Sequence, residues 1–242
     1  MIMELALQYL ARFTVLLLIL PMHEFAHAFA AHLNGDDTAK AEGRYTLNPF
    51  RHFDMIGLIC FLLVGFGWAK PVPVNPYNYR DYKKGSIWVA VAGVIANFAL
   101  AFLFYSLFVI TWEYLYPLAY GTAFILPVKF LLYCCLYGFI LDLSLFAFNL
   151  IPVYPLDGFR LMDALVKRKS KGYYEYKRVG YYVLLGLILF SSLCSRIPAL
   201  KFLDIFGYFM DFCVKIVGYP ISWLWDLIFG MDLRFELWTI IA

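Results

Sequence analysis

The chain has 242 residues, of which 63% are hydrophobic, 20% are aromatic and only 15% are charged. A soluble domain carries about 25% charged residues, so this composition argues against a soluble protein and makes the lipid bilayer the expected solvent. The net charge of +3 is small, and no aromatic residues interleave with the basic ones as on a nucleic-acid surface, so no nucleic-acid partner is expected.

The first apolar run extends from residue 5 to residue 33, long enough for a helix that crosses the bilayer, and Asn34-Gly-Asp-Asp37 ends it. The next apolar stretch begins at Met55 but is interrupted by Gly57, Gly65 and Gly67 and then meets Lys70-Pro-Val-Pro-Val-Asn-Pro76. Alternating Pro and Val does not form a helix. We therefore predict a re-entrant or β-hairpin element over residues 55–76, which membrane depth tolerates only where it lines a protein cavity.

Three further spans are predicted, over residues 86–112, 126–148 and 179–194. The remainder, 197–242, is apolar but interrupted by charges, and it fits one more span plus an interfacial helix. The fold class is therefore an all-α polytopic membrane protein of about five to six transmembrane helices, with the re-entrant element between the first two. Five cysteines without a CxxC pair are interpreted as small apolar residues within these spans.

The distribution of basic residues predicts the orientation. Loops 35–54, 77–85 and 159–178 contain Lys and Arg, whereas loop 113–125 has neither. Basic loops face the cytoplasm in multi-pass proteins. We predict a cell-membrane protein with its N-terminus outside, and residues 55–76 must return to the side they left.

The motif that carries chemistry lies in the first span. His23-Glu-Phe-Ala-His27 fits H-E-x-x-H, in which two imidazoles at positions i and i+4 project from one helix face and hold one ion. Glu24 lies on the flank, where a carboxylate can act as a general base without binding the metal. Ionisable side chains within a span cost free energy to bury in the bilayer, so their presence indicates a function. Zn²⁺ suits the pair, because a catalytic zinc takes three protein ligands and keeps an open position.

The third ligand must come from elsewhere in the chain. Asp142, Asp163 and several acids of the tail are candidates, but Asp157 is the best one. It follows the cytoplasmic end of a span on an irregular Pro-rich segment, at the same depth as His27. The sequence thus predicts one Zn²⁺ per chain, held by His23, His27 and Asp157 toward the cytoplasmic side.

These residues resemble the site-2 protease family of intramembrane zinc metalloproteases, in its compact form without a PDZ or CBS domain. Four stretches carry the resemblance, and their order and spacing match the family over about residues 5–165. They are His23-Glu-Phe-Ala-His27, Gly43-Arg-Tyr-Thr-Leu-Asn-Pro49, Gly67-Trp-Ala-Lys-Pro-Val-Pro-Val-Asn-Pro76 and Asn149-Leu-Ile-Pro-Val-Tyr-Pro-Leu-Asp-Gly158. A fifth stretch, Ala92-Gly-Val-Ile-Ala-Asn97, matches more weakly.

The resemblance implies that Glu24 is the general base and that Asn149 stabilises an oxyanion at the scissile carbonyl. It implies a substrate-positioning role for Asn97, and for Lys70, Pro71 and Val72 in the family's membrane-embedded β-hairpin region, which suits pairing with an unwound substrate strand. No segment here is long and polar enough for the PDZ or CBS domain of other members. The implied division is a catalytic membrane core, 1–165, followed by a basic cytoplasmic loop and C-terminal membrane helices, 166–242.

The expected activity is zinc-dependent cleavage of the transmembrane segment of a membrane-protein substrate. One alternative is a membrane zinc protease of another fold, such as a prenyl-protein processing enzyme, which usually takes a distal glutamate as third ligand. The other is a metal-dependent membrane chaperone or transporter that does not cut. The expected partners are the substrate helix and the lipid bilayer, and no oligomeric state is predicted.

Overall fold

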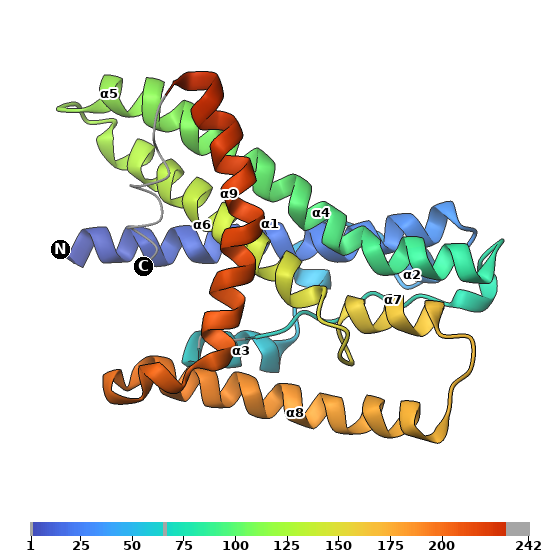
Figure 1. Ribbon diagram of the computed structural model, residues 1–242. Helices are drawn as coiled ribbons and strands as arrows, with labels where there is room; N and C mark the ends of the chain where they lie inside the picture. Colours follow the sequence, from blue (N-terminus) through green and yellow to red (C-terminus); the bar gives the residue numbers. More distant parts are fainter. Residues whose placement is uncertain (1, 65–66, 231–242) are drawn as a thin grey trace. The chain divides into compact units, whose positions relative to one another are not determined.

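The computed structural model describes residues 2–64 and 67–230 (Figure 1). The described part is predominantly helical, and five of its helices are long and apolar enough to cross a membrane. This agrees with the predicted all-α multi-pass protein. The five candidate spans equal the lower of the two predicted numbers. Gly65 and residues 231–242 of the predicted tail lie outside the described residues. The five long helices are α1 (Ile2–Leu33), α4 (Tyr82–Ile110), α6 (Ile125–Asn149), α8 (Lys171–Arg196) and α9 (Ile205–Phe229).

Shorter elements connect the long helices. Two of them, η3 and α5, continue α4, and η3 is π-helical. Another, α7, occupies the first part of the predicted loop 159–178, and α8 begins eight residues before the predicted span. The short elements are α2 (Thr38–Ala41), η1 (Pro49–Arg51), α3 (Met55–Val64), η2 (Pro76–Asn78), η3 (Thr111–Leu115), α5 (Tyr116–Ala119), α7 (Asp157–Leu165) and η4 (Pro198–Leu203).

The surfaces of the long helices are apolar. Large side chains such as Leu10 on α1, Phe98 on α4 and Leu189 on α8 are exposed. A protein in water rarely exposes so much contiguous apolar surface, whereas lipid tails solvate it without cost. The exposed side chains of the described long helices are therefore of the kind found on membrane spans.

The chain forms two compact units. Of the described residues, the first contains 2–19, Asn97–Ser144 and 212–230. Its core packs α4 against α6, with the Tyr105 and Phe139 rings 4.8 Å apart. The second contains Leu20–Ala96 and Leu145–Asp211, and it includes His23, His27 and Asp157. The predicted division at residue 165 concerns catalytic function and stays a prediction.

The predicted β-hairpin over 55–76 is not shown. Residues 55–64 form the helix α3, and the described residues contain no β-strand, only one isolated antiparallel bridge between Phe53 and Ala69. The backbone nevertheless doubles back, because a Cβ on Gly57 would lie 2.2 Å from the Trp68 carbonyl oxygen. An irregular extended segment then runs from residue 69 to residue 75.

The buried Asp36 anchors that extended segment to the end of α1. Its carboxylate accepts hydrogen bonds from the backbone N–H of Asn75 (2.6 Å) and from the Asn78 side-chain amide (2.8 Å). It also accepts from the Thr38 backbone N–H (3.1 Å) and hydroxyl. Burial acts to raise the pKa of Asp36, but these hydrogen bonds outweigh it and lower the pKa below its usual value.

Replacing Asp36 by alanine should destabilise the protein, because the buried N–H of Asn75 loses a charged acceptor. We expect the unfolding temperature in detergent to fall by roughly 5–10 °C. Since the folded-state pKa is lowered, the stabilisation is present above about pH 4 and is lost as the pH falls further. Asp37→Ala, which removes an exposed partner of His32, is the control and should change little. An equal loss in both variants would contradict the anchoring role.

Candidate metal centre

His23 and His27 lie one turn apart on α1 and both are buried. Their rings meet edge to face with centroids 4.7 Å apart, and the two Nε2 atoms are 3.1 Å apart. The i, i+4 spacing of the helix thus produces the convergent pair that the motif predicts.

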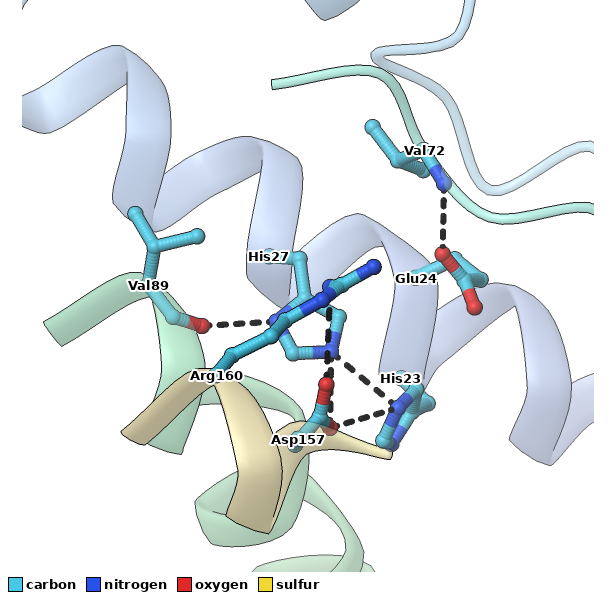
Figure 2. A network of polar contacts seen from close by, with 7 residues as sticks. All are labelled: His23, Glu24, His27, Val72, Val89, Asp157 and Arg160. Carbon is cyan, nitrogen blue, oxygen red and sulfur yellow. Dashed lines mark hydrogen bonds and ion pairs between the residues drawn. The ribbon is translucent and has the colours of Figure 1, made fainter. Parts of the chain in front are cut away.

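Asp157 joins the pair from a segment 130 residues later. It is the first residue of α7, and its Oδ2 atom lies 3.3 Å from His23 Nε2 and 3.1 Å from His27 Nε2 (Figure 2). The following residue, Gly158, permits this approach, because a Cβ there would lie 2.4 Å from the Leu150 carbonyl oxygen. The structure therefore brings the three predicted ligands together.

The three atoms fit a tetrahedral zinc. Ligands at about 2.0–2.1 Å from Zn²⁺ with tetrahedral angles are separated by about 3.3 Å, close to the distances between these Nε2 and Oδ2 atoms. His27 Nδ1 lies 2.7 Å from the Val89 carbonyl oxygen, which can only accept, so Nδ1 carries the proton and Nε2 presents a lone pair. A nitrogen lone pair and a carboxylate oxygen that face each other in a buried site repel each other, and a cation between them removes this repulsion.

The buried Asp157 carboxylate is stabilised by positive charge on the side that faces the two histidines. Burial acts to raise its pKa, but His27 and His23 outweigh that effect and hold the pKa well below its usual range. Arg160, one turn further along α7, places Nη1 3.5 Å from Asp157 Oδ1. The arginine therefore contacts Oδ1, whereas both imidazoles contact Oδ2 (Figure 2).

The helix α4 also packs closely against both imidazoles. Besides the Val89 carbonyl it contributes Gly93, where a Cβ would lie 2.5 Å from both His23 Cε1 and His27 Nε2. Only glycine lets α4 approach this closely. The loosely matched stretch Ala92–Asn97 belongs to this helix, but nothing in the sequence indicates that the α4 backbone lies against His23 and His27.

Glu24 lies beside His23 on α1 and contacts the extended segment. Its Oε2 accepts a hydrogen bond of 2.8 Å from the backbone N–H of Val72 (Figure 2). The same segment is held from the other side by Arg44, whose Nη2 lies 2.7 Å from the Lys70 carbonyl oxygen and 3.4 Å from that of Pro71. Residues 70–72 thus lie against the candidate base, a contact that orients one carboxylate oxygen and leaves Oε1 available to a water.

The other sequence-predicted residues are placed as follows. Asn149 is the half-buried last residue of α6, eight positions before Asp157. Asn97 is fully buried in the first unit, one turn beyond Gly93 along α4. Asp163 binds Lys169 and Tyr173 and is no part of the cluster. The roles of Asn149 and Asn97 in catalysis stay predictions.

One family model and several curated proteins match parts of the chain. Residues 125–191 match Peptidase family M50. YwhC of Bacillus subtilis is 41% identical over 145 residues, which are 60% of this chain and 64% of that protein. Rip2 of Mycolicibacterium smegmatis is 27% identical over 81% of this chain and 71% of its own length. MJ0611 of Methanocaldococcus jannaschii is 31% identical over 45% of this chain and 49% of its own length.

Each of the three relatives is named provisionally as a zinc metalloprotease. The matched region spans less than two thirds of YwhC and about half of MJ0611. No solved structure matches the chain. The resemblance to the site-2 proteases that the motifs indicated is confirmed by the family match and by these relatives.

Proposed function

We propose that this relative of the M50 peptidases is a zinc metalloprotease that cleaves membrane proteins within the bilayer. The observation that carries the proposal is the convergence of His23 Nε2, His27 Nε2 and Asp157 Oδ2 within 3.3 Å of one another, with Glu24 beside them. The names of the relatives support zinc as the metal. We propose one ion per chain, because the described residues contain one such cluster.

The proposed reaction is hydrolysis of a peptide bond. Zinc, when bound, would lower the pKa of a water toward about 7 and polarise the scissile carbonyl. Glu24 Oε1 takes the proton of the attacking water, while the Val72 N–H holds Oε2 in place. Glu24 then returns the proton to the leaving amine. The Asn149 side-chain amide would donate to the oxyanion that develops on the substrate.

The proposed substrate is a transmembrane helix that unwinds locally, since helical carbonyls are hydrogen-bonded and shielded. An unwound strand needs a backbone to pair with, and residues 70–72 lie extended beside Glu24. We therefore retain Lys70, Pro71 and Val72 as substrate-positioning residues and give Asn97 a supporting role on α4.

We propose that the site opens toward the cytoplasm and that the N-terminus is outside. The basic segments 35–54, 77–85 and 159–178, which lie between and after the site residues in the sequence, support this orientation. The Phe53–Ala69 bridge supports a re-entrant course for the intervening residues, because the chain returns to the level from which it departed. Irregular backbone such as residues 69–75 is tolerated at membrane depth only against protein or water.

Glu24→Gln tests the function. We expect at least a roughly 100-fold loss of cleavage, because a general base contributes about 10²–10⁴-fold. The experiment is co-expression with candidate single-span membrane proteins, in which uncut substrate should accumulate with the variant, followed by measurement of zinc in the purified protein. Zinc should be retained, since Glu24 is not a proposed ligand.

The matched control is Glu42→Gln, which neutralises an exposed glutamate of the same unit. It should cleave as the unmodified protein does. If Glu24→Gln leaves the cellular role of the protein intact, the chain is a metal-dependent chaperone or transporter and the protease proposal fails.

A further inference from the structure

A groove of about 560 Å³ runs along one face of α8 in the second unit. Seven residues of α8 line it at helical spacing, from Glu175 and Tyr176 through residues 179–180 and 183–184 to Leu187. The opposite wall is formed by residues 151 and 153, which precede α7, and by two phenylalanines at the start of α9. Apart from Glu175, whose carboxylate binds Arg178 at 2.7 Å, the lining is apolar or aromatic.

The groove matches the length of one lipid leaflet. Its face of α8, from Glu175 to Leu187, is about 18 Å long at 1.5 Å per residue. One leaflet of the hydrocarbon core is about 15 Å thick, close to that length. Because the lining is apolar or aromatic apart from Glu175, a hydrocarbon chain that lies along α8 contacts apolar surface over the length of the groove.

The end of the groove near Glu175 is cationic. The same helix face continues one turn back to Lys171, the first residue of α8, and Lys167 and Arg168 precede it. All three are exposed, and no ion pair forms to them from the residues that the structure describes. The neighbouring Lys169 binds Asp163, so it contributes less net charge. Lys171, one turn before the groove, and the two cations shortly before it in the chain complement one acyl chain with an anionic headgroup.

We propose that this groove is a binding site for one anionic phospholipid, with an acyl chain along α8 and the phosphate at Lys171, Lys167 and Arg168. Clusters of basic residues next to a span attract anionic headgroups. The site has a connection to the metal centre, because Tyr176 donates a hydrogen bond of 2.6 Å to the Pro152 carbonyl, five residues before Asp157. A bound lipid therefore braces the segment that carries Asp157.

The test is native mass spectrometry of the purified full chain in detergent, with phosphatidylglycerol or phosphatidylcholine added. We expect one tightly retained phosphatidylglycerol and weaker retention of phosphatidylcholine. Lys171→Gln should weaken phosphatidylglycerol retention roughly fivefold, and the triple change K167Q/R168Q/K171Q by about 100-fold. Val183→Trp should reduce retention of both lipids, because the indole fills the groove.

Two controls separate the site from general surface effects. Leu189→Trp places the same indole at an equally exposed position of α8 outside the groove, and Lys83→Gln removes one charge from the basic start of α4. Both should retain phosphatidylglycerol. Equal retention of the two lipids by the unmodified protein overturns the proposal. So does a Val183→Trp variant that keeps phosphatidylglycerol but no longer cleaves substrate, which would make the groove a substrate site. Lipid retention is measured without substrate or turnover, so a negative result leaves the protease proposal intact.

Discussion

Asp157→Ala is expected to abolish both zinc binding and proteolysis. The change removes the one carboxylate that faces the two Nε2 atoms, at 3.1 and 3.3 Å. Loss of an outer partner that merely orients a ligand costs about 10–100-fold in metal affinity, and loss of a direct ligand should cost more. The measurements are zinc content after purification, zinc affinity by competition with a chelator, and cleavage of a single-span substrate.

Asp163→Ala is the matched control, because it removes an acid from the same helix that binds Lys169 and Tyr173 instead of the cluster. It should retain zinc and activity. A full zinc complement in Asp157→Ala would mean that another residue completes the site. A distal glutamate in that position would favour the prenyl-processing type of membrane protease.

Gly93→Ala is expected to have the second-largest effect, although it removes no chemical group. The new Cβ would lie 2.5 Å from atoms of both imidazoles, so either α4 or the two rings must move. Misplacing reactive groups by about 1 Å can cost about 100-fold in rate. We therefore expect a fall of that order in kcat/KM, together with weaker zinc binding in the same competition assay.

Gly186→Ala provides the comparison within another long helix. A Cβ at that position meets nothing within 4 Å, and alanine favours a helix by up to about 1 kcal/mol over glycine. This variant should fold and cleave normally. Normal zinc affinity and turnover in Gly93→Ala would show that the contact between α4 and the imidazoles has no bearing on function.

The sequence predicted the meeting of His23, His27 and Asp157 because each ligand type has a distinctive pattern. The histidines follow the helical repeat within an apolar span, and Asp157 stands in an irregular segment beside one. The start of α8 was placed eight residues late, because basic residues were assigned to a loop. Ser170 was the available signal, since its Oγ caps the helix by accepting from the Tyr173 N–H.

Backbone contacts were beyond the reach of the sequence. The Val72 N–H that holds Glu24 and the Val89 carbonyl that orients His27 belong to residues whose side chains play no part in these bonds. The short helix α3 was also missed, because glycines within an apolar stretch predicted a broken, hairpin-like course.

The bond from His27 to the Val89 carbonyl has a consequence for how such proteins diverge. A main-chain oxygen is present whatever amino acid occupies position 89, so ordinary substitutions there can remove neither the acceptor nor the choice of tautomer. The course of the α4 backbone therefore determines whether this hydrogen bond forms, and the bond is lost only if the helix shifts. Alignments of relatives would therefore record the packing of the buried Val89 side chain with Ala31 and Tyr79, and not the role of its backbone in orienting the catalytic imidazole.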